Sequence, residues 1–470
     1  MFKKRGVLFA AVILPLFFSS CTTIIEIKDK IFEAISSSSD SSKTHDSGTK
    51  ISVKPSGYKT PDSYDKAYSY RTDKTDKTIQ TFIKTKNVDS LRNTNPNEYV
   101  KTIVSKINEI TQDDFERVKL VHDAICLLVS YDAKNFWANT VPEQDWQNVV
   151  KTKTAVCEGY ANLFQKFCEE LKISSKKVTG YARGVGSDIL NENPNDSNHA
   201  WNIVQIEGFW YLVDCTWDSG YMKGKSSVQS YTTDWLFLKP EHFIYSHFPD
   251  DSRNQLIQTP LSNSAFTSLP DFRPKLFEIT QNNFYPSNKI NPVDSSIDIE
   301  YKLKQGYTLS FSSQAVGGPT IKNRIITEKQ ETITKTTIQF PSAGKYMITV
   351  FYGKEGSNQG QSCGQFIVDA ANGSIIQYPT IYPVKSNSAQ LLSPKLSPLV
   401  AGETVTFEVF CDDRTFVAVI IGRNFIQLEN DGTGLFKGEV SIPKNTKQLS
   451  IGLSTKKTSS YETLATFEVK

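Results

Sequence analysis

The sequence predicts an α+β protein in which a domain of helices and antiparallel strands is followed by two all-β sandwich domains. Three observations carry this prediction. Apolar residues recur at helical spacing between residues 97 and 171. Two β-rich runs with a turn signal between them follow at 199–216. From about Ser262 onward, short β-rich runs alternate with clusters of Gly, Pro, Asn and Ser, at the spacing typical of sandwich strands and turns.

The first residues have the layout of an export signal. Basic residues at 3–5 precede the apolar stretch 6–18, and two serines separate that stretch from Cys21. The stretch is shorter than the ~20 apolar residues of a membrane-spanning helix. We predict that residues 1–21 are a lipoprotein-type signal peptide with lipidation at Cys21, which resembles a bacterial lipobox although Phe18 stands where Leu is usual. The protein would then be lipid-anchored to a membrane of the cell envelope, outside the cytoplasm; cleavage without lipidation would give a secreted protein.

The charge balance and the cysteines exclude several classes of partner. The chain carries 53 basic and 50 acidic side chains, and the basic residues of the signal account for the surplus. A nucleic-acid binder needs a basic surplus or stripe, so nucleic acid is not expected as a partner. None of the seven cysteines stands in a CxxC pair, which argues against zinc. Because an EF-hand loop is also missing from the sequence, we expect no metal and no other cofactor.

Residues 22–95 are predicted to be a flexible tether followed by an ill-defined segment. Residues 37–50 are rich in Ser, Thr and Asp, a composition that cannot bury a core. The stretch from there to about Asn95 is rich in Tyr, Lys and Thr without a firm pattern, and no structure is assigned to it.

Three helices are predicted to open the ordered part of the chain. Runs 98–110 and 113–129 carry apolar residues at helical spacing, and residues 111–114 have the form of a capping box before the second run. A third helix is expected to begin near Thr154, a good N-cap, and to run to about Leu171.

Strands are predicted to follow the third helix. A strand at 176–183 precedes two β-rich runs, 199–206 and 209–216, that are separated by a Glu-Gly pair typical of a hairpin. With a two-residue turn, Asp214 becomes the diagonal neighbour of His199 on one face of the sheet. A shift in register by one residue would place the two side chains on opposite faces.

Cys157, His199 and Asp214 form the constellation with the most chemical content. A thiol enzyme needs a nucleophile, a base within hydrogen-bond reach and a group that orients the base. Cys157 stands in the first turn of the third predicted helix, where unpaired N–H groups and the helix dipole lower a thiol pKa. Each residue alone has a structural explanation, as a packed Cys, a strand His and a turn-forming Asp. Their order and the hairpin geometry together predict a catalytic triad.

The residues around this triad carry a family resemblance. They are Thr154-Ala155-Val156-Cys157-Glu158-Gly159-Tyr160-Ala161, Asn198-His199-Ala200-Trp201-Asn202 and Tyr211-Leu212-Val213-Asp214-Cys215-Thr216-Trp217. These segments resemble the transglutaminase-like (papain-type) superfamily, as does 178–184, and 237–249 resembles its kyphoscoliosis-peptidase branch, which also carries β-sandwich modules. The resemblance implies a papain-like transglutaminase core at 96–262, followed by immunoglobulin-like sandwiches at 263–375 and 376–470.

The sequence offers strand candidates for both sandwiches. Those of the first are 297–303, 307–311, 332–340 and 345–352, and those of the second are 404–410, 416–421, 435–442, 447–453 and 463–469.

The resemblance implies acyl transfer on a protein or peptide substrate. Cys157 would attack an amide, His199 would shuttle protons and Asp214 would orient the imidazolium, through an acyl-enzyme. We favour hydrolysis, by a cysteine peptidase or amidohydrolase. Two alternatives stay open: a transamidase that cross-links proteins with the same triad, and a non-catalytic surface scaffold or ligand-binding lipoprotein.

Outside the predicted triad, few polar groups are candidates for a role in the site. The Cys157 backbone N–H is one expected donor to the oxyanion. Related papain-type folds use a side chain upstream of the nucleophile, which makes Gln147 a candidate, although a surface Gln in a loop is the alternative. His122, His242 and His247 have no metal-type spacing with acidic residues, and we interpret them as structural.

Overall fold

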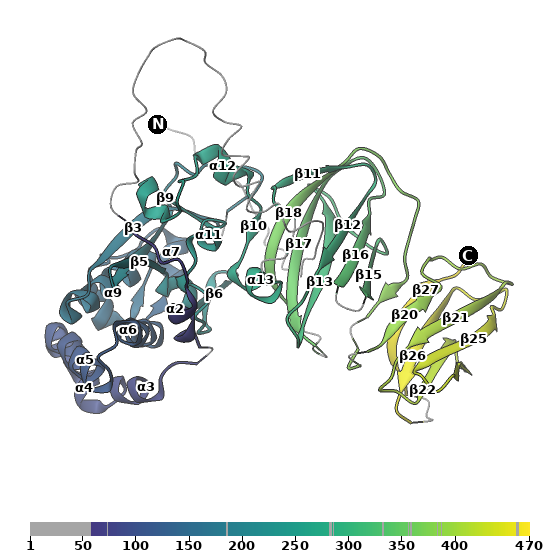
Figure 1. Cartoon of the computed structure of the whole chain (residues 1–470), viewed down its shortest axis with the longest axis horizontal. Coiled ribbons are helices and arrows are strands. Elements are labelled where there is room, and N and C mark those ends of the chain that lie inside the picture. Colours follow the sequence, from purple (N-terminus) through teal and green to yellow (C-terminus); the bar gives the residue numbers. More distant parts are fainter. Residues whose placement is uncertain are drawn as a thin grey trace, which may run out of the picture. The chain divides into compact units, whose positions relative to one another are not determined.

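The computed structural model describes residues 58–470 with the exception of 73, 185–186, 282–283, 285, 331–332, 356, 358–359, 383, 387 and 457–459. The described chain forms two compact units that divide between Thr267 and Ser268 (Figure 1). The predicted signal peptide and the lipidation of Cys21 lie outside the described residues. No helix among those described is long and apolar enough to cross a membrane.

The first unit is built around an antiparallel sheet with the strand order β8-β5-β4-β3-β9. The strands are β3 (Ser175–Ala182), β4 (His199–Ile206), β5 (Phe209–Val213), β8 (Leu236–Leu238) and β9 (His247–Pro249). The predicted hairpin is confirmed, because Ile206 pairs with Phe209. Glu207 and Gly208 both have positive φ, as a two-residue type I′ turn requires.

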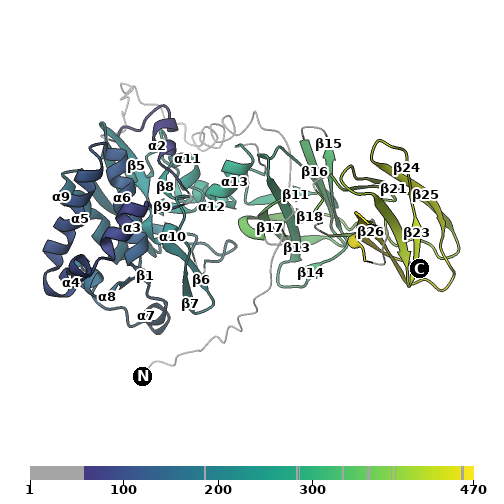
Figure 2. The ribbon, with the colours of Figure 1, turned by 90° about the horizontal axis from the view of Figure 1, so that it is seen from below.

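The two faces of this sheet are buried by different partners. On one face lie the helices α5 (Pro96–Ile110), α6 (Asp114–Leu128) and α9 (Cys157–Leu171) (Figure 2). Val204 and Val213 of the sheet join the helices in one core, together with Phe164 of α9. Trp201 and Ile203 belong to a second core on the opposite face, as the alternation of side chains along a strand requires.

Shorter elements complete the first unit. They are β1 (Ser130–Tyr131), α7 (Ala133–Ala138), α8 (Trp146–Thr152), β2 (Thr154–Ala155), α10 (Cys215–Ser219), β6 (Gly220–Lys223), β7 (Ser226–Gln229), α11 (Pro240–Phe243), the 3₁₀ turn η2 (Ser252–Gln255) and α12 (Asn263–Ser268).

Two predicted helix starts differ from the observed ones. α6 begins after Asp113, whose carboxylate accepts two N–H groups of the first turn, so Asp113 rather than Thr111 is the N-cap. α9 begins at Cys157 rather than near Thr154, because Thr154 and Ala155 pair as strand β2 with strand β1. Because of this pairing, Cys157 is the first residue of the helix, whereas the sequence predicts it inside the first turn.

Residues 58–95, with the exception of 73, are the described part of the segment predicted to be ill-defined, and they are folded, which corrects that part of the prediction. The predicted tether at 37–50 lies outside the described residues. The folded part contains α2 (Asp65–Ser69), α3 (Lys77–Ile83) and α4 (Lys86–Thr94). Tyr64, Ile79 and Ile83 are buried in the helix-side core of the first unit. The longest of the three helices has nine residues, too few to show a periodic apolar stripe in the sequence.

The second unit is built almost entirely of strands. A six-stranded sheet contains β10 (Asp271–Phe272), β11 (Ile290–Val293), β13 (Tyr307–Ala315), β14 (Thr320–Ile321), β17 (Gly344–Lys354) and β18 (Gly360–Ala370), and a three-stranded sheet contains β12 (Ser296–Tyr301), β15 (Ile325–Gln330) and β16 (Ile333–Gln339). A short helix, α13 (Pro274–Ile279), lies between β10 and β11 in the chain.

The C-terminal strands form two further sheets. One contains β19 (Thr380–Ile381), β22 (Phe416–Ile421), β23 (Asn424–Gln427), β26 (Gln448–Ser454) and β27 (Glu462–Glu468), and the other contains β20 (Gln390–Ser393), β21 (Thr404–Phe410), β24 (Glu429–Asn430) and β25 (Leu435–Ser441). Phe407 of one sheet and Val417 of the other are buried in a common core. Each predicted strand overlaps an observed one, whereas the sandwich boundary at 375/376 stays a prediction.

Candidate active site

Cys157 is the first residue of α9, where a helix N-terminus acts strongly on a thiol. Its N-cap, Val156, is extended and gives no capping hydrogen bond from its side chain, so N–H groups of the first turn are left for another acceptor. The half-buried thiol lies near the side chain of His199 and the backbone N–H of Ala200, and both lower its pKa. The predicted nucleophile therefore lies against the start of strand β4.

His199 opens β4, and its Nε2 lies 2.7 Å from Oδ2 of Asp214. Asp214 is the N-cap of α10, and its Oδ1 accepts the backbone N–H groups of Thr216 at 2.8 Å and Trp217 at 3.1 Å. Because a carboxylate only accepts, the imidazole donates through Nε2, which leaves Nδ1 for the thiol of Cys157. The structure thus brings the three predicted residues together.

These groups shift one another's pKa in directions that favour an ion pair. Burial raises the pKa of the Cys157 thiol, but attraction and hydrogen bonding by His199 outweigh burial and lower it. Burial lowers the pKa of His199, whereas Asp214 and Cys157 raise it to about 10. Burial raises the pKa of Asp214, yet His199 and His247 hold it below its usual range. All three shifts favour the charged forms, which are thiolate, imidazolium and carboxylate.

Residues 101–215, which contain all three side chains, match the family model described as the transglutaminase-like superfamily. This part of the chain is a transglutaminase-like domain. The family resemblance and the α+β fold predicted from the sequence are confirmed.

Curated relatives of the domain point to one branch. Kyphoscoliosis peptidase of Mus musculus is 32% identical over 179 residues, which cover 35% of this chain and 26% of the relative. Kyphoscoliosis peptidase of Homo sapiens is 32% identical over 171 residues, 35% of this chain and 25% of the relative. Lim and transglutaminase domain protein ltd-1 of Caenorhabditis elegans is 21% identical over 222 residues, 41% of this chain and 30% of the relative. The chain therefore spans about a quarter of the length of the peptidases it matches.

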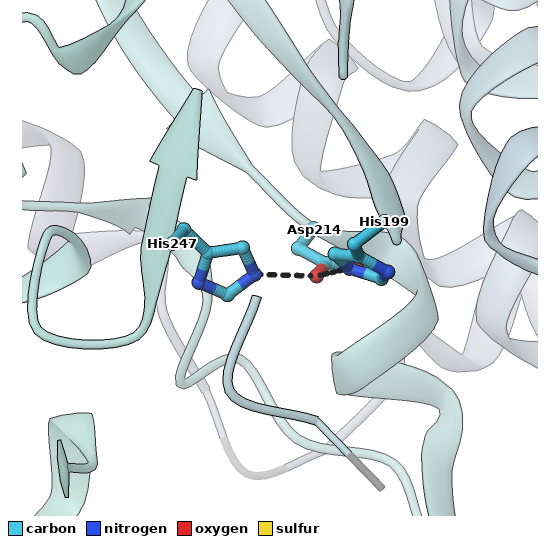
Figure 3. A group of neighbouring side chains, drawn as sticks. All are labelled: His199, Asp214 and His247. Atoms are coloured by element: carbon cyan, nitrogen blue, oxygen red, sulfur yellow. Dashed lines mark hydrogen bonds and ion pairs between the residues drawn. The ribbon is translucent and has the colours of Figure 1, made fainter. Parts of the chain in front are cut away.

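His247, interpreted from the sequence as structural, contacts the triad of the transglutaminase-like domain. Its Nε2 lies 3.2 Å from Oδ2 of Asp214, the same oxygen that bonds His199. Figure 3 shows the two imidazoles on opposite sides of this oxygen. His247 begins β9, which pairs with β3 so that His247 lies opposite Ala182. Sequence reasoning missed the contact because β9 has only three residues and offers no periodicity from which to assign a register.

His199, Asp214 and His247 are also residue types that bind metal ions, and their ligand atoms all lie within 4.8 Å of one another. A metal site needs donor atoms that surround a common point. Here the carboxylate oxygen lies between the two imidazole nitrogens (Figure 3) and is within hydrogen-bond distance of both. The arrangement fits a hydrogen-bonded chain of His, Asp and His.

The structure places Gln144, rather than the predicted Gln147, beside the nucleophile. Gln147 lies exposed on α8, and its backbone N–H donates to Asp145. Gln144 Oε1 instead accepts the N–H of Val156, the residue before the nucleophile, at 2.9 Å. Gly159 permits this approach, since a Cβ at that position would lie 2.6 Å from the same oxygen.

A second buried network holds the far end of α10. Asp218 lies 3.0 Å from His122 Nε2 and also accepts the backbone N–H of Trp235. Burial opposes charge on His122, but the carboxylates of Asp123, 3.6 Å from Nδ1, and of Asp218 raise its pKa to about 10. The network ties α6 to α10 and so helps to fix Asp214 at the other end of that short helix.

Proposed function

We propose that the chain is an exported thiol acyl-transfer enzyme, a cysteine peptidase or amidohydrolase that cleaves amide bonds of a protein or peptide through an acyl-enzyme. The observation that carries the proposal is the hydrogen bond between His199 and Asp214 beside Cys157, and the pKa shifts of Cys157 and His199 toward thiolate and imidazolium support it. The similar proteins of mouse and human are named peptidases, which supports hydrolysis.

Acylation follows from the positions of these groups. The Cys157 thiolate attacks the carbonyl carbon of the amide, and the carbonyl π pair moves to oxygen. The Cys157 backbone N–H, at the start of α9, can donate to that oxyanion. The C–N bond then breaks while the His199 imidazolium gives its proton to the leaving nitrogen, which leaves a thioester and a free amine.

Deacylation uses the same residues in reverse. Water gives a proton to the neutral His199 ring and attacks the thioester carbon, and the Cys157 thiolate leaves with its bonding pair. Asp214 stabilises the imidazolium that forms. An amine in place of water would give a new amide, which is the transamidase alternative, so a test of activity has to offer both nucleophiles.

Export and lipid anchoring at Cys21 are part of the proposal and rest on the layout of the leader. Expression of the full chain in a bacterium with a labelled fatty acid should give labelled protein, and Cys21→Ser should abolish the label. Unlabelled protein with a processed N-terminus would instead indicate a secreted enzyme.

The test of the triad is the pH dependence of alkylation by iodoacetamide, followed at each cysteine by mass spectrometry. Cys157 should react rapidly well below the ordinary thiol pKa of ~8.5 and lose this reactivity in His199→Ala. Cys168, buried with its pKa raised by burial, is an internal control that should stay slow. A Cys157 profile no faster than that of Cys168 would reject the enzyme in favour of the scaffold.

A reactive thiolate would justify a screen for substrates. Peptides are offered with and without a primary amine, and Cys157→Ala serves as the inactive control. Release of a free amine alone identifies a peptidase or amidohydrolase, whereas formation of a new amide identifies a transamidase.

A further inference from the structure

The second imidazole on Asp214, that of His247, is not used by the proposed chemistry. Because Asp214 Oδ2 only accepts, the His247 Nε2 at 3.2 Å carries a proton and donates it. The other ring nitrogen, Nδ1, lies 2.9 Å from the hydroxyl of Ser246. His247, Ser246 and Asp214 are all buried, so these hydrogen bonds lie in a medium of low dielectric, where they are stronger than in water.

The surroundings of His247 hold its ring in place. The aromatic rings around it, with the distances between ring centres, are Phe243 (4.1 Å), Trp217 (4.4 Å), Trp235 (4.9 Å) and Trp201 (5.1 Å). Asp214 and His199 are titratable groups that face it, the latter at 5.4 Å between ring centres. The packing fixes the direction of the His247 donor toward one oxygen of the triad carboxylate.

We propose that His247 is a positioning residue of the triad. It holds the Asp214 carboxylate in the orientation that serves His199, and its N–H, a second donor to Oδ2, stabilises the negative charge of the carboxylate. This inference rests on the proposed function. Asp214 thereby has two donors on each oxygen: two backbone N–H groups on Oδ1, and two imidazoles on Oδ2.

Loss of the His247 donor has a defined electrostatic consequence. A buried carboxylate oxygen that loses one of two donors attracts the remaining donor more strongly, so the pKa of His199 should rise. An imidazolium that holds its proton more tightly is a weaker acid toward a leaving amine. His247 thus limits how far Asp214 raises the pKa of His199.

The experiment measures the titration of His199 by NMR of the ¹³C-labelled histidine Cε1–H groups, from about pH 5 to about pH 11. It uses the full chain carrying Cys157→Ala, because the missing thiolate removes one cause of the raised pKa of His199 and brings the titration into an accessible range. His199→Ala assigns the signal.

Two variants of this parent chain decide the proposal. His247→Phe keeps an aromatic ring in the packing but has no donor, and should move the His199 midpoint upward by about one pH unit. His247→Gln places an amide N–H near the position of Nε2 and should return the midpoint to that of the parent. If His247→Phe does not fold, His247→Asn, whose amide is too short to reach, should show the same upward shift relative to His247→Gln.

The outcomes separate this inference from the proposed function. An unchanged midpoint in His247→Phe, or a His247→Gln variant that behaves like His247→Phe, overturns the role of His247 even if the enzyme is active. An ordinary thiol profile of Cys157 in the unsubstituted chain overturns the proposed function, and the His199 midpoints still decide whether His247 acts on Asp214.

Discussion

Asp214 serves the helix and the triad with different oxygens. Oδ1 caps α10 through two backbone N–H groups, and Oδ2 accepts from His199 and His247. The carboxylate charge is needed for the imidazolium, whereas the cap needs only an accepting oxygen. A substitution that keeps one oxygen can therefore separate the two roles.

We expect Asp214→Asn to remove most of the reactivity and little of the stability. The amide retains a capping oxygen but no longer raises the pKa of His199, so alkylation of Cys157 near pH 6 should become at least about tenfold slower and amide cleavage roughly 10⁴-fold slower. Asp214→Ala also loses the cap and should cost about 1 kcal/mol more in unfolding free energy. Equal unfolding free energies of the two variants would contradict this division of roles.

The buried His122 should make the first unit less stable in alkaline solution. Its pKa is about 10 in the folded chain and ~6.5 when unfolded. Between these values the folded state binds more protons than the unfolded state, so the unfolding free energy falls as pH rises. The stabilisation is complete below about pH 6.5 and is lost as the pH passes about 10. Urea unfolding at several pH values should show this slope.

The variant His122→Gln tests whether His122 causes this dependence of the unfolding free energy on pH. The variant should be less stable than the parent near neutral pH, because Asp123 and Asp218 lose their cationic partner. The difference should shrink as the pH approaches 10, where the parent loses the same charge. A difference that is independent of pH would show that His122 acts by packing alone.

At the scale of the element, the start of α9 depends on the absence of a side chain at Gly159. A Cβ there would lie 2.6 Å from Gln144 Oε1, 2.7 Å from the Ala155 Cβ and 2.8 Å from a Val149 methyl. Gly159→Ala should gain ~1 kcal/mol in helix propensity but lose about 1–3 kcal/mol to overpacking. We expect net destabilisation and slower alkylation of Cys157. Gly184→Ala, whose Cβ would lie 3.5 Å from Trp217 and meet no other described residue within 4 Å, should be nearly neutral.

The elements also show what the sequence could reveal. Strand 199–206 was predictable with its bounds, because alternating residues and a turn signal act locally. The start of α9 was not predictable, because Thr154 pairs with Ser130 in a strand, and this pairing overrides the preference of Thr154 for the N-cap position. The position of His247 was equally out of reach, because a three-residue strand gives no periodicity. Gln144 and Gln147 are indistinguishable by composition, and only the fold brings one of them to the nucleophile.

At the scale of the whole molecule, the tryptophans give a probe for one unit. All six lie between positions 137 and 235, inside the first compact unit. Tryptophan fluorescence therefore reports the unfolding of the transglutaminase-like unit, and far-UV circular dichroism reports both units. The two signals together can show to which unit a buried residue belongs.

The contacts of Phe266 indicate where the first unit ends. The predicted boundary after residue 262 would assign Phe266 to the first sandwich, yet its carbonyl accepts a hydrogen bond from the Arg183 guanidinium at 3.1 Å. Its ring lies 4.4 Å beneath that guanidinium and 5.0 Å from the ring of Phe248. Because Phe266 is fully buried, Phe266→Ala should lower the unfolding free energy seen by tryptophan fluorescence by about 3–5 kcal/mol.

Phe340→Ala is the matched control, because Phe340 is equally buried but lies in the second unit. It should weaken the transition seen by circular dichroism and leave the tryptophan transition unchanged. If Phe266→Ala behaves like Phe340→Ala, the boundary predicted from the sequence is right and α12 belongs to the sandwich. If Phe266→Ala weakens the transition seen by tryptophan fluorescence, Arg183 anchors α12 to the transglutaminase-like unit, and a separately expressed unit has to extend past Phe266.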